Sequence, residues 1–179
     1  LWLSDWHGEV YLDACCGVGE STLNLAQRHP NVRIIGVDKS ALRLQKHGSY
    51  VHKSAKHDNI KSQNISVLAV KNYRVIQADL NDFWRLLRNT IEQSPAQVKW
   101  KLTKQFLFSP NPYPKKSQLG KRWHGSAVFP DIMACCSNIE IRSNWRIYVE
   151  EFITAMSILG HQASVEALLI DSHNPPITP

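Results

Sequence analysis

Near the start of the chain, acids and glycines have the spacing of a nucleoside-binding site. Asp13 closes a short apolar run, residues 10–12, and Gly17 and Gly19 follow it, with Asp38 after the next apolar segment. Glycine lets a backbone turn tightly and approach a ligand closely, because it has no Cβ. A carboxylate such as Asp38 can accept hydrogen bonds from both hydroxyls of a ribose. The set predicts an adenosine-containing ligand; the alternative is a plain turn whose glycines serve only the fold.

The surrounding pattern indicates the elements that position these residues. Residues 10–12 have the pattern of a buried strand, 20–29 of a helix and 33–37 of a second strand with Asp38 at its tip. In an open parallel sheet, ligands bind beyond the carboxyl ends of the strands. A dinucleotide site has G-x-G-x-x-G, and Thr22 replaces its third glycine. The D-x-x-x-G-x-G pattern instead resembles the first motif of class I S-adenosylmethionine-dependent methyltransferases.

Length and composition are those of one globular domain. The chain has 179 residues, of which 43% are apolar and 20% are charged. No apolar run approaches the ~20 residues of a membrane span, so we expect no membrane association. Because the chain begins at Leu1 without a methionine and ends at Pro179 after an apolar run, we expect a single methyltransferase-like domain over residues 1–179 that is truncated at both ends. Composition leaves the oligomeric state open.

Cysteine and histidine spacing argues against a metal site. The four cysteines form two adjacent pairs, Cys15-Cys16 and Cys135-Cys136, which lack the spacing of zinc ligands. His47, His52 and His57 recur every five residues, which does not place them on one helical face, so we expect basic surface residues. We expect no metal, reduced thiols and a cytoplasmic protein.

Basic residues gather in two segments. Between Glu92 and Asp131 there is no acid, and between Lys39 and Lys61 the only acid is Asp58. The bases in the first segment are Lys99, Lys101, Lys104, Lys115, Lys116, Lys121 and Arg122. Segments in which all the charged residues are positive attract polyanions, although an ordinary solvated surface has the same pattern. Beside a nucleoside motif, they make tRNA or another RNA a candidate partner.

Further strands and helices follow along the chain. Tyr73–Leu80 is predicted to be a third strand, near whose end Asp79 could bind the exocyclic amine of adenine or cap the next helix. Strands are also expected over 105–108, 138–142 and 164–170, and helices over 40–50, from 82, over 126–136 and over 148–159. The pattern predicts an α/β, Rossmann-like class I methyltransferase fold with a mostly parallel central sheet and helices on both faces.

A rigid loop follows the strand at 105–108. Its sequence, PNPYPKK, has prolines at alternate positions, which forbid a helix and stiffen the chain. The loop holds Asn111, Tyr113, Lys115 and Lys116 beyond the carboxyl end of a strand. An aromatic face with nearby cations suits a base and its phosphate.

This loop resembles a known family. PNPYPKK after FLFS, and downstream of DACCGVG, is similar to the tRNA (guanine-N7-)-methyltransferase family, whose loop reads PDPWPKK. The segment IEIRSNWRIYVEEF resembles that family's strand and following helix, which contain T-D-W and a tyrosine with acids after it. The resemblance spans roughly residues 10–179 and implies a divergent member.

The resemblance assigns two halves of a site. It implies that S-adenosylmethionine is bound by Asp13, Cys15, Gly17, Gly19, Asp38, Lys39, Asp79 and Leu80, although Cys15 is usually a glycine in class I methyltransferases. It implies that the target base and its surroundings are bound by Asn111, Tyr113, Lys115, Lys116 and Asn144, with Asn111 and Asn144 at the catalytic positions. The GKRWH segment, residues 120–124, could grip phosphates around the target nucleotide.

The substrate half departs from the family at both catalytic positions. Asn111 and Asn144 stand where the family has aspartates. An asparagine keeps one acceptor oxygen but loses the charge that strengthens hydrogen bonds and offsets the positive charge created by N7 methylation. Three outcomes stay open: weaker guanine methylation, another RNA position or a small-molecule substrate, and a cofactor-binding module that binds RNA or a partner with little activity.

Overall fold

The computed structural model describes residues 2–51, 70–93 and 98–164. Its sheet is parallel throughout, with strand order β3-β2-β1-β4-β5. The strands are β1 (Glu9–Ala14), β2 (Arg33–Asp38), β3 (Tyr73–Gln77), β4 (Lys101–Phe108) and β5 (Ile139–Arg142). The helices are α1 (Glu20–Arg28), α2 (Ala41–Leu44), α4 (Leu80–Gln93), α5 (Phe129–Cys135), α6 (Arg146–Ile158) and the 3-10 helices η2 (Lys116–Lys121) and η3 (Trp123–Gly125). The predicted Rossmann-like fold is confirmed.

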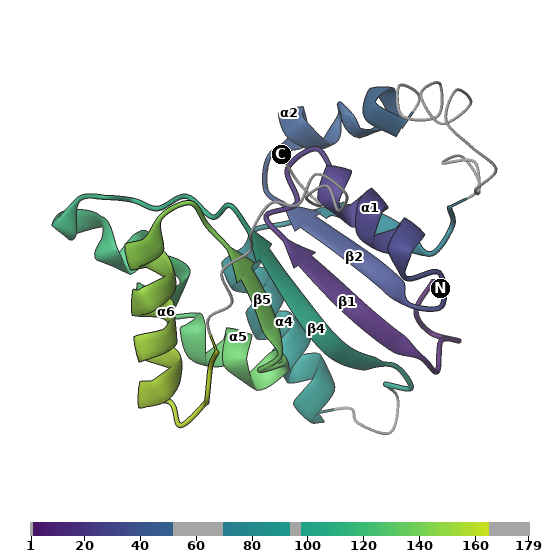
Figure 1. Cartoon of the computed structure of the whole chain (residues 1–179). Helices are drawn as coiled ribbons and strands as arrows, with labels where there is room; N and C mark the ends of the chain where they lie inside the picture. The colour runs from purple at the N-terminus through teal and green to yellow at the C-terminus, as the bar shows by residue number, and fades with distance from the viewer. Residues whose placement is uncertain (1, 52–69, 94–97, 165–179) are drawn as a thin grey trace.

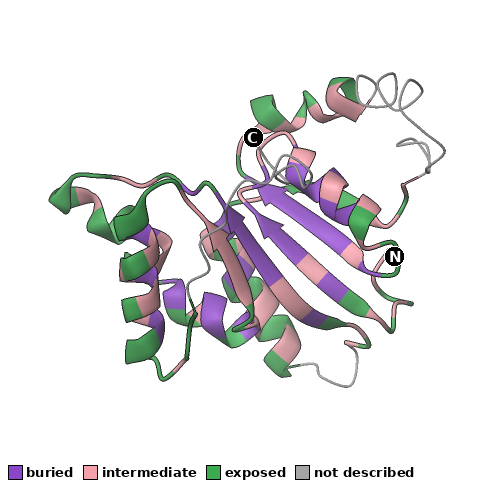
Figure 2. Ribbon diagram, in the orientation of Figure 1, coloured by how far each residue is buried: buried purple, intermediate pink, exposed green. Residues whose placement is uncertain are grey.

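The strands are buried because both faces of the sheet are covered. On one face, Ile34 of β2 and Phe106 of β4 pack against Leu25 of α1. On the other face, strand residues such as Leu12 and Leu107 belong to a larger core formed with α4, α5 and α6. Figure 1 shows α1 on one side of the sheet and α4 and α5 on the other. Figure 2 shows that burial is densest along the carboxyl-terminal halves of the central strands.

A buried glutamine organises the larger core. Gln105 of β4 is 0% exposed and accepts a hydrogen bond from Nε1 of Trp84 at 2.8 Å. Its amide nitrogen donates to the carbonyl oxygens of Ile132 at 2.8 Å and Cys136 at 2.6 Å. One side chain therefore joins β4 to α4 and to the end of α5, and every polar group involved is satisfied.

Several element boundaries differ from the expectations. Helix α4 begins at Leu80 rather than near residue 82, because Oδ1 of Asp79 accepts the backbone N–H of Asn81 at 2.8 Å and caps the helix. Helix α2 is capped by Ser40 as expected and ends at Leu44, and after a turn at 45–46 the chain is helical again over 47–51, so the helix predicted over 40–50 is interrupted. Helix α5 begins at Phe129, with Pro130 in its first turn.

The apolar stripe of α6 is only partly core. The expected core residues Phe152 and Met156 are buried, but Leu159 is 42% exposed. Leu159 lies at the end of the helix, beside Gly160, whose φ of +80° ends the helix in the left-handed conformation. The strand predicted over 164–170, and His52 and His57, lie outside the described residues apart from Ser164 itself, which is not in a strand. No helix in the described parts of the chain is both long and apolar enough to span a bilayer.

Candidate active site

The parallel topology brings the predicted site residues to one edge of the sheet. The glycine turn follows β1, Asp38 ends β2, and Asp79 lies just after β3. The proline loop follows β4 and Asn144 follows β5. All the strands run in the same direction, so all of these segments leave the sheet at its carboxyl edge. Between β1 and β4 the strand order reverses, which is where ligands of doubly wound sheets bind.

The two glycines of the turn have different surroundings. Both have positive φ, +62° at Gly17 and +82° at Gly19. A Cβ on Gly17 would meet no atom within 4 Å, whereas one on Gly19 would lie 2.6 Å from Nδ1 of His47 and 2.9 Å from a methyl group of Val75. Gly17 therefore faces open space where a ligand can approach the backbone, and Gly19 is needed for packing.

Cys15 has the backbone conformation of a glycine. Its φ is +63°, in the left-handed region, which is unusual for a residue with a side chain. The motif that Cys15 departs from has a glycine at this position, and the conformation supplies the physical reason. Burial, with a smaller contribution from the charge of Asp38, raises the pKa of the Cys15 thiol to about 12, so this thiol is unreactive at neutral pH.

Asp38 fixes the glycine turn to the tip of β2. Its carboxylate is 2% exposed and accepts the backbone N–H of Gly17 at 3.0 Å through Oδ2. Oδ1 accepts the backbone N–H of Ser40 at 2.8 Å and pairs with Arg43 at 3.2 Å. The carboxylate is therefore ordered at the edge where a ribose is predicted. A ribose hydroxyl would have to use the remaining lone pair of Oδ2 or displace the half-exposed Arg43 from Oδ1.

Asp13 points into the protein, toward α1. It is 1% exposed, and its Oδ2 accepts hydrogen bonds of 2.6 Å from the hydroxyls of both Ser21 and Thr22. Burial raises the pKa of Asp13 to about 6, although both hydroxyls lower it. The side chain holds the first turn of α1 against β1, and its predicted contact with a cofactor stays a prediction.

The remaining cofactor-side residues lie close to this edge. Asp79 is exposed and caps α4, so the capping interpretation is confirmed, while an adenine contact stays a prediction. Hydrogen bonds from the side chain and backbone of Asn81 hold the pKa of Asp79 below its usual value. Lys39 is exposed and Leu80 is buried.

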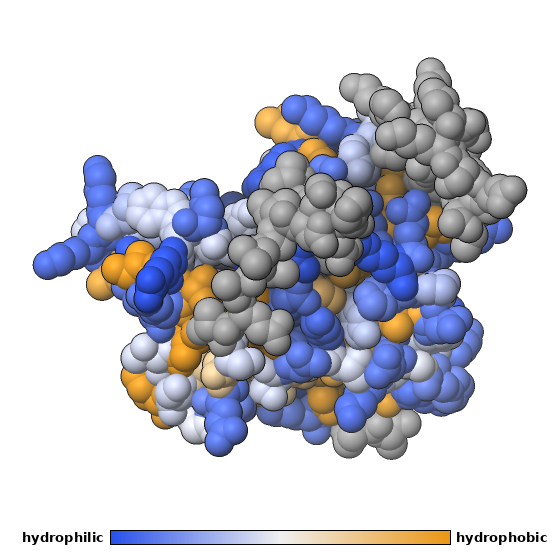
Figure 3. Space-filling model, in the orientation of Figure 1, coloured by the Kyte–Doolittle hydropathy of each residue, from blue (hydrophilic) through white to orange (hydrophobic). Residues whose placement is uncertain are grey.

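The proline loop presents polar and aromatic groups beside this edge. Oδ1 of Asn111 accepts the backbone N–H of Tyr113 at 3.3 Å, and Tyr113 has a φ of +43°. The ammonium of Lys121 lies 6.0 Å from the centre of the Tyr113 ring. Lys115 and Lys116 are exposed. Figure 3 shows hydrophilic side chains projecting at the left of the view, where Figure 1 places the segment after β4.

Asn144 lies on a different loop of the same edge. It is exposed in the connection between β5 and α6, beside Trp145, which is 41% exposed. The two loops are joined at their base, where the backbone N–H of Ser109 donates to the carbonyl of Arg142 at 2.8 Å. Asn111 and Asn144 therefore lie in the loops that follow two adjacent strands, β4 and β5, at one edge of the sheet.

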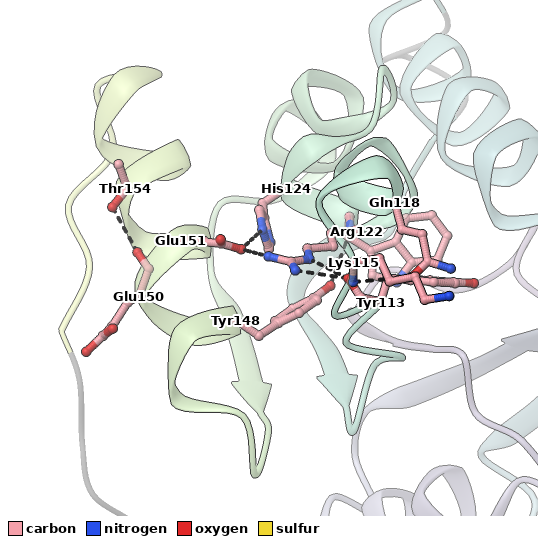
Figure 4. Close-up of polar contacts among 10 residues, drawn as sticks. Tyr113, Lys115, Gln118, Arg122, His124, Tyr148, Glu150, Glu151 and Thr154 are labelled. Carbon is pink, nitrogen blue, oxygen red and sulfur yellow. Dashed lines mark hydrogen bonds and ion pairs between the residues drawn. The ribbon is translucent and has the colours of Figure 1, made fainter.

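The expectation that residues 120–124 grip phosphates is wrong for Arg122 and His124. The Arg122 side chain is 7% exposed and forms an ion pair with Glu151 of α6. Nε2 of His124 lies 3.0 Å from the same carboxylate, and this ring is also 7% exposed. Figure 4 shows Arg122 between Glu151 and the backbone of Tyr113. Both side chains are bound inside the protein, which leaves the exposed Lys121 as the residue of this segment best placed to meet a phosphate.

Sequence reasoning missed His47. Its ring bridges the glycine turn and β3, with Nδ1 at 2.8 Å from the carbonyl of Val18 and Nε2 at 3.0 Å from the hydroxyl of Tyr73. The expectation of a basic surface residue is therefore wrong for His47. Its partners are distant in sequence, so local spacing gives no signal for them. The cysteines are free thiols, and the described residues contain no cluster of three potential metal ligands.

One family model covers most of the chain. The model of the family described as "Putative methyltransferase" matches residues 7–166, which include the glycine turn, the proline loop and the segment around Asn144. None of the curated protein sequences compared with this chain is significantly similar to it.

Solved structures with a related chain path include several methyltransferases. The antibiotic-resistance methyltransferase Kmr shares 14% identity, with a TM-score of 0.49, over 89% of this chain and 81% of Kmr. Coclaurine N-methyltransferase, bound to N-methylheliamine and SAH, shares 17% identity, with a TM-score of 0.40, over 78% of this chain and 32% of that protein. PKMT2 from Rickettsia typhi shares 17% identity, with a TM-score of 0.36, over 70% of this chain and 19% of that protein. The chain thus spans less than half the length of the latter two proteins.

Proposed function

Because the chain belongs to the methyltransferase family of the tRNA guanine-N7 enzymes, we propose that it transfers the methyl group of S-adenosylmethionine to N7 of guanine in tRNA. The observation that carries the proposal is the placement of the two motifs. The glycine turn follows β1 and the proline loop follows β4, and these strands are neighbours across the point where the strand order reverses. A methyl donor at the turn would therefore lie beside a base held by the loop.

The residues of the cofactor half fit S-adenosylmethionine. The open space at Gly17 admits a ligand to the backbone, and the ordered carboxylate of Asp38 stands beside it. The exposed Asp79 and Lys39 follow the neighbouring strands. When bound, S-adenosylmethionine supplies a methyl group on a sulfonium sulfur that leaves as a neutral thioether.

In this proposal, the residues of the substrate half orient the target base toward the methyl group. N7 of guanine carries a lone pair and needs no strong general base, so the main contribution of the protein is to hold N7 in line with the methyl group. The oxygens of Asn111 and Asn144 would accept hydrogen bonds from N1–H and the N2 amine of guanine. Tyr113 offers a face for stacking, and the exposed Lys115 and Lys116 offer charge to a phosphate.

A second candidate is methylation of a different base or of a small molecule. It is favoured by the amides at Asn111 and Asn144, because an amide both donates and accepts hydrogen bonds, whereas the N1–H and N2 groups of guanine require acceptors. Aspartates would also offset the positive charge that develops at the purine, and neutral amides do not. On this ground we expect guanine methylation by this chain to be slower than the same site would give with two aspartates.

Restoring the aspartates tests the substrate. Purified protein is incubated with S-adenosylmethionine and an unmodified tRNA transcript, and nucleosides are quantified by mass spectrometry. We expect 7-methylguanosine from the wild type, and about tenfold faster formation in the Asn111→Asp/Asn144→Asp variant, since charge-assisted hydrogen bonds are roughly twice as strong as neutral ones.

Asn31→Asp is the matched control. Asn31 is exposed in the turn between α1 and β2, at the opposite edge of the sheet, so this substitution adds a charge away from the site. If neither the wild type nor the double variant forms 7-methylguanosine, the guanine N7 assignment is wrong. A different methylated nucleoside in the same digest would then identify the second candidate.

A further inference from the structure

The proline loop has no regular secondary structure, so its position depends on side-chain contacts. The residues between β4 and η2 are irregular, and Ser109 and Tyr113 both have positive φ. The stiffness of the prolines fixes the shape of the loop but not its placement relative to the neighbouring elements. A base contacted by both Asn111 and Asn144 requires the loop to be held against the β5–α6 connection.

Arg122 makes this connection through a planar fork. Its Nε and Nη2 donate to the carbonyl oxygen of Tyr113 at 3.2 and 2.9 Å, while Nη1 pairs with the carboxylate of Glu151 on α6. One guanidinium thus holds the loop backbone on one edge and the helix on another, as Figure 4 shows. A second link lies beside it, where the backbone N–H of Trp123 donates to the hydroxyl of Tyr148 at 3.3 Å.

The ion pair between Arg122 and Glu151 is largely shielded from solvent. The Arg122 side chain is 7% exposed and that of Glu151 is 33% exposed. Partial burial raises the pKa of Glu151, but hydrogen bonds from Arg122 and His124 outweigh it and hold the pKa below its usual value. Burial lowers the pKa of His124, so its ring is neutral at pH 7 and donates to Glu151 as an uncharged group.

We propose that Arg122 and Glu151 are positioning residues that hold the proline loop against α6 and so fix Asn111 relative to Asn144. The inference rests on the proposed function for what the loop binds, but the geometry stands without it. Neither residue would touch the reacting atoms. Their effect on a substrate would come through the carbonyl of Tyr113, two residues from Asn111, and through α6, which begins two residues after Asn144.

The test compares two neighbouring glutamates of α6. Glu151→Gln removes the carboxylate charge from the partly buried pair and keeps the size of the side chain. Glu150→Gln is the matched control, because Glu150 makes an exposed ion pair with Arg146 at 2.7 Å, a class that contributes little to stability. Hydrogen exchange of the peptide covering 109–118 is measured by mass spectrometry. We expect exchange in this peptide to be at least tenfold faster in Glu151→Gln than in the wild type or Glu150→Gln.

Arg122→Lys separates positioning from simple charge pairing. A lysine keeps the charge but lacks the fork, so it cannot hold Glu151 and the Tyr113 carbonyl together in the same way. We expect this variant to show the same fast exchange, together with a raised KM for RNA and an affinity for S-adenosylhomocysteine within about twofold of the wild type. Wild-type exchange in both Glu151→Gln and Arg122→Lys would overturn the proposal. Because exchange is read without turnover, a wild type that methylates no tRNA would refute the proposed function and leave this test intact.

Discussion

The backbone N–H of Gly17 donates to Oδ2 of Asp38 over 3.0 Å, which joins the turn after β1 to the tip of β2. Asp38 therefore has two roles. Its carboxylate stabilises the left-handed turn at Gly17, and it lies at the edge of the sheet where a ribose is predicted to bind. Without the carboxylate, the N–H of Gly17 and that of Ser40 would lose their shared acceptor.

Alanine at the two glycines should separate ligand binding from stability. Gly17→Ala places a methyl group where no atom lies within 4 Å, so we expect a stability loss of about 1–2 kcal/mol from positive φ alone. The same methyl group would occupy the space of the ligand and weaken binding of S-adenosylhomocysteine at least tenfold. Gly19→Ala adds overlap with His47 and Val75, which should cost about 1–3 kcal/mol more.

Urea unfolding and calorimetric titration of the two variants check this prediction. The ordering is the decisive result, with Gly19→Ala less stable than Gly17→Ala. Unimpaired binding in a folded Gly17→Ala variant would show that no ligand approaches this turn.

Titration of Asp13 should lower the stability of the protein as the pH rises, which is the opposite of the usual effect of a carboxylate. Burial raises its pKa to about 6 from a usual 3.8, so the folded protein binds this proton more tightly than the unfolded chain. The contribution of Asp13 to the free energy of unfolding therefore falls as pH rises from 3.8 to about 6, and the loss is nearly complete by about pH 7.

Asp13→Asn removes this titration while its amide oxygen can still accept from Ser21 and Thr22. We expect the stability of the variant, relative to the wild type, to increase by about 2.5 kcal/mol between pH 4 and pH 7. Urea titrations across this range measure the difference. A difference that stays constant with pH would mean that Asp13 does not titrate in this window.

The hydrogen bonds of Gln105 should contribute strongly to stability. Gln105→Leu leaves Trp84 Nε1 and the carbonyl oxygen of Cys136 without this partner inside the core, whereas the carbonyl oxygen of Ile132 still accepts the backbone N–H of Cys136 at 3.4 Å. Each unsatisfied group costs about 1–3 kcal/mol. We expect a loss of about 3 kcal/mol or more in the free energy of unfolding by urea.

Thr103→Val is the control on the same strand, because the Thr103 hydroxyl is buried with no hydrogen-bond partner in the described part of the chain. This variant should be as stable as the wild type or more stable. Equal effects from Gln105→Leu and Thr103→Val would contradict the importance of the Gln105 bonds.

The sequence predicts those parts of the fold that depend on local pattern. Apolar runs identify the strands, and alternation explains why Phe106 and Leu107 face opposite layers. Glycine and acid spacing identifies the carboxyl edge because parallel strands bring their ends together. Contacts between distant residues carry no such signal. The bond of His47 to Val18 and the pairing of Arg122 with Glu151 join segments far apart in the chain.

For the same reason, the interpretation of Arg122 as a phosphate-binding residue, which is based on the local charge, is wrong. A cation in a basic stretch has the same local pattern whether it faces solvent or a buried carboxylate. Asp13 is a similar case, because its motif marks a ligand site while its side chain is bonded to α1. The sequence therefore locates the site, and the structure separates the residues that build it from those that face a ligand.

The proposed function requires that the carboxyl edge of the sheet binds the nucleoside of a methyl donor. Nuclear magnetic resonance during titration with S-adenosylhomocysteine measures this binding residue by residue, with NAD as the comparison. We expect saturable binding of S-adenosylhomocysteine but not of NAD, with backbone amide shifts concentrated at residues 15–19, 38–39 and 78–80. Absence of binding, or shifts confined to other parts of the molecule, would show that the methyl donor does not bind at this edge.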